Sequence, residues 1–206
     1  MTEGSGARPI DTGGAQADRR SAEHRTDGSR AALLAVRHLV REIPDFPKPG
    51  IVFRDITPLF GDAEALQSAT TALADYGADV GAEYVVSAEA RGFVLGGAIA
   101  TRIGAGFAAA RKPGRLPRDT NSVKYQLEYG VDALEMHSDA LPHGARVLVH
   151  DDLLATGGTA EALCGLVEQA GAEVAGCAFV IELAFLDGRQ RLAPRNVHSL
   201  ISYDSE

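Results

Sequence analysis

The stretch of sequence richest in groups that could do chemistry runs from Val147 to Ala160 and reads VLVHDDLLATGGTA. An apolar run of strand length leads into two adjacent carboxylates, then into small residues and a helical pattern. Ligands of open α/β sheets bind at the carboxyl ends of the strands. In that position Asp151 and Asp152 would suit two vicinal hydroxyls of a ribose.

The small residues after this acid pair favour an anion site. Backbone N–H groups of residues 155–159 could approach a phosphate closely, and the following helix adds the positive end of its dipole. Thr156 and Thr159 supply hydroxyl donors. The competing interpretation is an ordinary strand, turn and helix capped by a threonine, and for a bare TGGT it would be preferred. Two acids directly before the turn are harder to explain as structure alone.

The elements that must position these groups follow from apolar patterning. Strands are expected at 84–88, 107–110, 146–150 and 174–181, and helices at 62–76, 93–103 and 159–170. An earlier helix is expected from Leu33 to Ile43, ended by Pro44. Alternating strands and helices predict an α/β fold, with a mostly parallel twisted sheet flanked by helices on both faces.

Two segments lack such patterning. Residues 1–29 are rich in Gly, Ala, Ser, Asp and Arg, so they predict a disordered tail before a single domain spanning 30–206. Residues 112–139 contain few large aliphatic side chains. We interpret them as a long loop without secondary structure, and such loops are often functional lids.

Bulk composition narrows the class of protein. The chain of 206 residues has a formal net charge of −8, which excludes the basic footprint of a nucleic-acid or anionic-membrane binder. The sequence shows no membrane span and no secretory signal, so a cytoplasmic location is expected. Cys164 and Cys177 form no metal or redox motif and are expected to be buried, reduced thiols.

Five motifs, in order, resemble those of the type I phosphoribosyltransferases and, within them, of the adenine-specific family. The segment 147–160 resembles the family's signature for 5-phosphoribosyl-1-pyrophosphate (PRPP). The others are PKPGIVFRDIT at 47–57, EARGF at 89–93, RKPGRLP at 111–117 and YQLEYG at 125–130. These resemble the base-binding loop, the pyrophosphate loop and the two ends of a catalytic lid.

The resemblance implies a type I phosphoribosyltransferase fold with a small base-binding hood and a mobile catalytic lid. It implies an enzyme of purine salvage that converts adenine and PRPP to AMP and pyrophosphate. Mg²⁺ would enter with PRPP, held mainly by the substrate and water, and the protein would be a homodimer. A cis peptide is expected between Glu89 and Ala90.

The resemblance also assigns roles by position. Glu128 and Arg91 are the expected catalytic residues, with Glu128 near the purine imidazole. The residues expected to bind PRPP are Asp151, Asp152, Ala155, Thr156, Gly157, Gly158, Thr159, Lys112 and Arg111. Lys112 and Arg91 would face the pyrophosphate, and Arg111 would reach the neighbouring subunit's site. The residues expected to bind adenine are Val52 and Arg54, through backbone groups, and Phe53 and Leu153, which sandwich the ring.

Two alternatives stay open at this point. A PRPP-sensing regulator could share the fold without catalysis, although Arg111, Lys112 and Glu128 argue for lid chemistry. Specificity for hypoxanthine or guanine is also open, because a base read by backbone groups is not encoded in side chains. His150 departs from the usual apolar residue before the acid pair. We interpret it as a tolerated strand residue.

Overall fold

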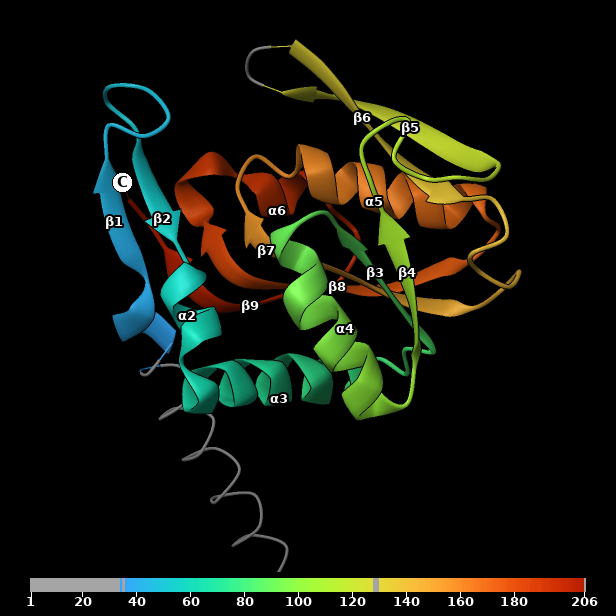
Figure 1. Ribbon diagram of the computed structural model, residues 1–206, viewed down its shortest axis with the longest axis horizontal. Coiled ribbons are helices and arrows are strands. Elements are labelled where there is room, and N and C mark those ends of the chain that lie inside the picture. The colour runs from blue at the N-terminus through green and yellow to red at the C-terminus, as the bar shows by residue number, and fades with distance from the viewer. Residues whose placement is uncertain (1–33, 35, 128–129, 206) are drawn as a thin grey trace, which may run out of the picture.

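The computed structural model describes residues 34, 36–127 and 130–205 (Figure 1). Residues 36–39 are helical. The remaining elements, in chain order, are β1 (Arg41–Pro44), β2 (Val52–Asp55), α2 (Thr57–Gly61), α3 (Ala63–Asp79), β3 (Tyr84–Ala88), α4 (Arg91–Ile103), β4 (Gly106–Ala110), β5 (Thr120–Leu127), β6 (Gly130–His137), β7 (Arg146–Leu154), α5 (Gly158–Gln169), β8 (Glu173–Leu183), η1 (Ala184–Leu186), α6 (Gly188–Arg191) and β9 (Val197–Tyr203). The expected tail at 1–29 lies outside the described residues.

The central sheet has five strands in the order β4-β3-β7-β8-β9, and every neighbouring pair is parallel. This confirms the α/β fold with a mostly parallel sheet flanked by helices. Ranked by sequence, the strands lie in the order 2-1-3-4-5, so the direction of winding reverses between β3 and β7. In doubly wound sheets the ligand crevice lies at this switch point, outside the carboxyl ends of the strands.

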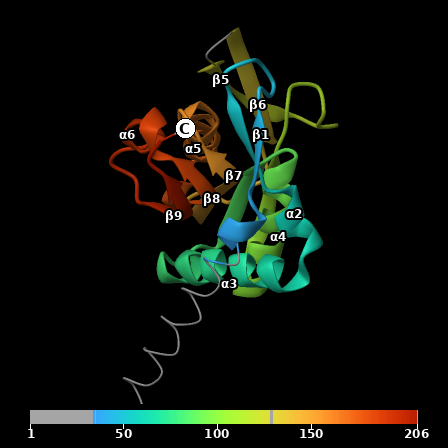
Figure 2. The same ribbon diagram turned by 90° about the vertical axis from the view of Figure 1, so that its left-hand side faces the viewer.

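Two apolar cores cover the two faces of the sheet (Figures 1 and 2). On one face Leu73 of α3 and Leu95 of α4 pack against strand residues that include Val85. On the other face Leu163 of α5 packs with Val86. Neighbouring residues of a strand point to opposite faces, so β3 supplies both cores. Each such side chain contributes about 1.5–3 kcal/mol when fully buried.

The predicted N-terminal helix is wrong in its second half. Arg41–Pro44 forms β1, which pairs antiparallel with β2, and Ile43 lies opposite Phe53. Pairing with β2 satisfies the backbone groups of this segment, and that gain outweighs the helical spacing of three aliphatic residues. The two strands make a small hood beside the sheet (Figure 1). Leu33, the predicted start of the helix, lies outside the described residues.

The expectation of a structureless loop at 112–139 is also wrong. β5 and β6 form an antiparallel hairpin from Thr120 opposite His137 to Leu127 opposite Gly130. Leu134 and Met136 of β6 are buried in the core that α5 covers. A hairpin draws its hydrogen bonds from its partner strand and needs apolar residues on one face only, so a low aliphatic content did not exclude it. The base of the expected lid is therefore anchored.

The last strand, β9, had not been predicted, whereas α3 begins as expected. The Asp62 carboxylate accepts a hydrogen bond from the backbone N–H of Ala65 at 2.9 Å, so it caps the helix. Within the part of the chain that the structure describes, no helix is both long and apolar enough to cross a membrane.

Candidate active site

The acid pair lies within strand β7, near its carboxyl end, rather than after the strand. β7 continues to Leu154, and Asp151 lies opposite Phe179 of β8. Asp152 is only 6% exposed. Burial and the adjacent Asp152 carboxylate raise the pKa of Asp151 well above its usual range. Burial also raises the pKa of Asp152, although the Arg91 guanidinium opposes that shift. Without a ligand, the pair is short of compensating positive charge and hydrogen-bond donors.

Arg91 connects three predicted subsites. It begins α4, directly after β3, and therefore lies at the switch point of the sheet. Its Nε lies 2.6 Å from Oδ2 of Asp152. Its Cζ lies 5.3 Å from the ring centroid of Phe53, on the hood. The structure thus brings together residues expected for pyrophosphate, ribose and base. The Glu89–Ala90 peptide before it is cis, as expected.

Gly92 allows α4 to approach the acid pair. A Cβ atom at this position would lie 2.8 Å from Oδ1 of Asp151. Any larger residue would therefore displace the carboxylate or the helix. Sequence reasoning included Gly92 only as a letter in a motif, because the neighbour that requires glycine is distant in the chain.

Residues 155–159, which we call the phosphate loop, join β7 to α5. The N-cap of α5 is Gly157, in the left-handed region at φ +83°, so the alternative of a threonine-capped helix is wrong. A glycine N-cap has no side chain to occupy the N–H groups of the first turn, and these suit an anion. The loop packs on the start of α6, where a Cβ on Gly188 would lie 2.1 Å from the carbonyl oxygen of Ala155. Sequence reasoning missed Gly188.

Arg111 and Lys112 are held by a carboxylate that sequence reasoning did not single out. Glu89 accepts hydrogen bonds from the backbone N–H of Lys112 and from Nε of Arg111, both at 2.8 Å. These contacts, the backbone one foremost, hold the pKa of Glu89 below its usual range. Nζ of Lys112 lies 3.0 Å from Oδ2 of Asp132 on the hairpin.

The predicted base-binding residues divide between two elements. Val52, Phe53 and Arg54 lie on β2 of the hood. Arg54 is only 7% exposed, pairs with Glu42 of β1 and stacks over the Tyr203 ring at 4.4 Å. The Arg54 side chain therefore stabilises the hood through buried contacts and does not lie on the surface. Leu153 of β7 is half-buried against the core that α3 and α4 cover.

Comparison with known proteins shows the family of this chain. A family model described as a phosphoribosyl transferase domain matches residues 65–201. An adenine phosphoribosyltransferase of Rubrobacter xylanophilus is 58% identical over 172 residues, which cover 83% of this chain and 93% of that protein. One from Methylococcus capsulatus is 56% identical, over 82% of this chain and 98% of that protein. The chain belongs to the adenine phosphoribosyltransferase family.

Solved adenine phosphoribosyltransferases share the fold. The enzyme of Thermoanaerobacter pseudethanolicus is 47% identical with a TM-score of 0.81, over 83% of this chain and 99% of that one. The enzyme of Saccharomyces cerevisiae, solved in complex with an imino-altritol bisphosphate and adenine, is 36% identical with a TM-score of 0.78 and the same coverages.

Glu128 and His150 both belong to the motifs that resemble those of the family. Glu128, the expected catalytic carboxylate, lies outside the described residues. His150 is fully buried, and its Nδ1 donates to the carbonyl oxygen of Ala178 at 2.9 Å. Burial lowers the pKa of His150 to about 4, so the ring is neutral at pH 7. A buried, neutral ring agrees with the interpretation of a strand residue.

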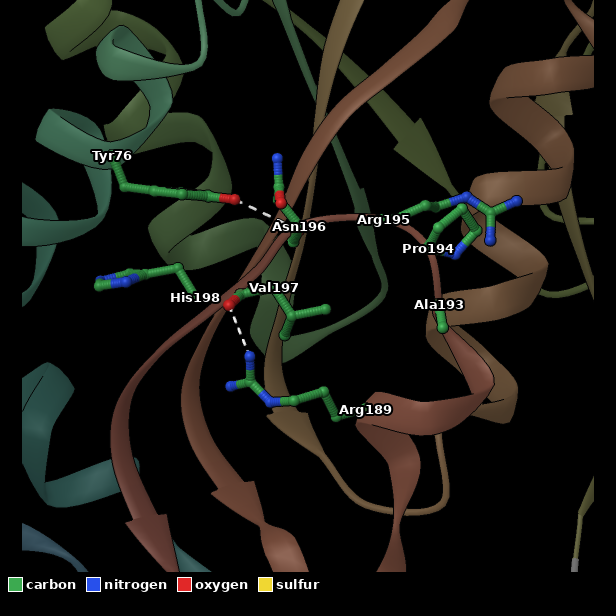
Figure 3. Close-up of a pocket in the computed structure, with 8 residues that line it drawn as sticks. All are labelled: Tyr76, Arg189, Ala193, Pro194, Arg195, Asn196, Val197 and His198. Atoms are coloured by element: carbon green, nitrogen blue, oxygen red, sulfur yellow. Dashed lines mark hydrogen bonds between the residues drawn. The ribbon is translucent and has the colours of Figure 1, made fainter.

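A surface hollow lies elsewhere on the molecule, away from the acid pair (Figure 3). It is lined by Tyr76, Arg189 and residues 193–198, at the amino end of β9, whereas the acid pair lies near the carboxyl end of β7. Its arginines form ion pairs: Arg189 with Glu182 and Arg195 with Glu168.

The two thiols expected to be buried, Cys164 and Cys177, are buried and free, with Sγ atoms 3.8 Å apart.

Proposed function

We propose that this protein transfers the phosphoribosyl group of PRPP to adenine, giving AMP and pyrophosphate. The observation that carries the proposal is the position of Arg91 at the sheet switch point. It is ion-paired to Asp152 and lies beside Phe53, within reach of all three expected subsites. Family membership at 58% identity supports the same activity.

PRPP would bind across the switch point. The phosphate loop and the first turn of α5 receive the 5′-phosphate, and the acid pair receives the ribose hydroxyls. The ribose hydroxyls would donate hydrogen bonds to the two buried carboxylates. These hydrogen bonds would offset the burial that raises the pKa values of both groups. Arg91 would leave its ion pair with Asp152 and bind the pyrophosphate, and Lys112 would bind the pyrophosphate from the other side.

The reaction forms a bond from a ring nitrogen of adenine to the anomeric carbon and breaks the bond from that carbon to pyrophosphate. Positive charge develops on the sugar ring, and negative charge on the leaving group. Asp151 and Asp152 would stabilise the first, and Arg91 and Lys112 the second. Glu128 would accept or hold the proton lost from the purine imidazole.

Mg²⁺ fits this site as a companion of the substrate. Among the described residues, no group of three or more His, Cys, Asp or Glu side chains could hold a metal. The two adjacent carboxylates offer oxygen donors, and Mg²⁺ is commonly held by one or two carboxylates with substrate phosphates and water. When bound, the ion would neutralise charge on the departing pyrophosphate.

We also propose a cytoplasmic homodimer. Two apolar side chains, Val94 of α4 and Phe107 of the edge strand β4, are 45% and 40% exposed. Arg111 follows β4 directly. A two-fold contact through this edge would cover both apolar residues and bring Arg111 towards the partner's site.

The deciding experiment measures AMP, IMP and GMP formation by the purified protein with Mg²⁺, PRPP and each base. Adenine should be used far faster than hypoxanthine or guanine. Each mispaired buried polar group costs about 1–3 kcal/mol, and hypoxanthine reverses adenine's donor and acceptor at two positions. Equal rates with all three bases would contradict adenine specificity. Turnover of none, with PRPP still bound, would favour the regulator.

A further inference from the structure

Asp132 on β6 is a charged residue that the proposed reaction does not use. Its Oδ2 lies 3.0 Å from Nζ of Lys112, and its Oδ1 accepts a hydrogen bond from the backbone N–H of Ala133 at 2.9 Å. The Asp132 side chain is 22% exposed, whereas that of Lys112 is 60% exposed. The short, half-buried carboxylate is therefore the fixed partner, and the long lysine side chain is the group that it holds.

The hairpin connects Asp132 to the phosphate loop. Asp132 lies directly opposite Tyr125 of β5. The Tyr125 hydroxyl lies 3.4 Å from Oδ2 of Asp132. The neighbouring Thr159 side chain opposes the rise that burial gives the pKa of the same phenol. Val123 and Tyr125 also pack on the core beneath α5. Polar contacts thus run from the phosphate loop, through the hairpin, to Lys112.

Lys112 is held at both ends. Its backbone N–H donates to Glu89, and its ammonium pairs with Asp132. The hydrogen bond from Lys112 keeps the pKa of Asp132 below its usual range, so the carboxylate is ionised at neutral pH. An ammonium has three N–H donors, so it can keep Asp132 while another N–H points to a phosphate oxygen.

We propose that Asp132 is a positioning residue that holds the Lys112 ammonium oriented towards the pyrophosphate of PRPP. The inference rests on the proposed function, because it takes Lys112 as a pyrophosphate ligand. Loss of Asp132 would leave a flexible lysine to be ordered by PRPP itself, at a cost in side-chain entropy. Ion pairs with a largely exposed partner are weak, so we expect PRPP affinity to fall about two- to fivefold.

The test is a double-mutant cycle read by calorimetric titration of the full chain with PRPP and Mg²⁺, without adenine. Asp132→Asn should weaken PRPP binding about two- to fivefold, and Lys112→Met should weaken it more. In the Lys112→Met background, Asp132→Asn should have no further effect. A merely structural role for Asp132 would weaken binding equally in both backgrounds.

Asp139 provides the matched control. It follows β6, and its carboxylate pairs with Arg118 at 2.5 Å on an exposed surface. Asp139→Asn should leave PRPP affinity unchanged. Unchanged or tighter PRPP binding by Asp132→Asn, or the same loss in both backgrounds, would overturn the inference while leaving the proposed function intact. Unchanged binding by Lys112→Met would contradict the proposed role of Lys112 and remove the inference with it.

Discussion

At the scale of single residues, the candidate site contains charged groups that burial destabilises and ion pairing stabilises. Asp151 and Asp152 are adjacent carboxylates at a buried strand end, and among the described residues the guanidinium of Arg91 forms an ion pair with Asp152. This arrangement is costly without a ligand and is resolved by one that brings hydroxyl donors.

Glu128→Gln should keep PRPP binding and lower turnover. The substitution retains shape but removes the carboxylate proposed to assist proton transfer, and loss of such a group typically costs about 10²–10⁴-fold. The measurement is a single-turnover rate at saturating adenine and PRPP, which separates chemistry from product release. Glu64→Gln, in the first turn of α3, is the control and should have no effect. A near-wild-type single-turnover rate would show that Glu128 does not assist proton transfer.

His150 should make the protein less stable in mild acid. Its pKa falls from 6.5 to about 4 on folding, so the unfolded chain binds its proton first as pH decreases. The stability that depends on a neutral ring is complete above pH ~6.5 and is lost as pH falls towards 4. Between pH 7 and 5 this group alone should cost about 2 kcal/mol.

Urea unfolding at both pH values measures this loss for the wild type and for His150→Leu. The variant should lose less free energy of unfolding than the wild type on acidification. His143→Gln, at an exposed position, should behave as the wild type. Parallel losses in His150→Leu and the wild type would show that the buried imidazole is not the titrating group.

At the scale of elements, close approach between backbone segments decides the site geometry. The start of α4 lies against Asp151, and the phosphate loop lies against the start of α6, each through a glycine. Both contacts join segments far apart in the chain. They explain why small residues occur beside the acid pair, beyond any need for flexibility.

Gly92→Ala should weaken PRPP binding, because the new methyl group would lie 2.8 Å from Oδ1 of Asp151. Overpacking of this kind typically costs about 1–3 kcal/mol. Gly97→Ala, in the same helix, meets no atom within 4 Å and should raise the melting temperature, since alanine favours helix by about 1 kcal/mol over glycine. Calorimetry with PRPP and thermal unfolding read both effects. Equal PRPP affinity in the two variants would show that α4 yields without moving Asp151.

At the scale of the whole molecule, the edge strand β4 and the helix α4 that precedes it each expose an apolar side chain. These side chains are Val94 of α4, 45% exposed, and Phe107 of β4, 40% exposed. The proposed two-fold contact would cover both side chains.

Val94→Asp should convert the proposed dimer to monomer, because it places a charge in an apolar interface. Light scattering after size-exclusion chromatography measures the mass, and thermal unfolding checks that the monomer is folded. Ile51→Asp, which changes an exposed apolar residue of the hood, should leave the dimer unchanged. A Val94→Asp protein of unaltered mass would locate any dimer contact elsewhere.

The amino-acid sequence by itself determined the fold class, the strands at the centre of the sheet and the position of residues 151–159 at the junction of a buried strand and a helix. Local patterns carry this information, because a buried parallel strand and a helix start each have their own composition. The order of motifs also implied the family, which the comparisons confirmed.

Only the tertiary structure decided what depends on partners distant in the chain. The segment expected to be a loop, 112–139, contains a hairpin, and the end of the expected first helix forms β1. Strand pairing supplies the backbone hydrogen bonds of both segments, and no local pattern encodes that pairing. The tertiary structure also showed that Glu89 holds Arg111 and that Asp132 holds Lys112. These carboxylates come from separate strands and loops, and only the folded chain brings each within 3.0 Å of its partner.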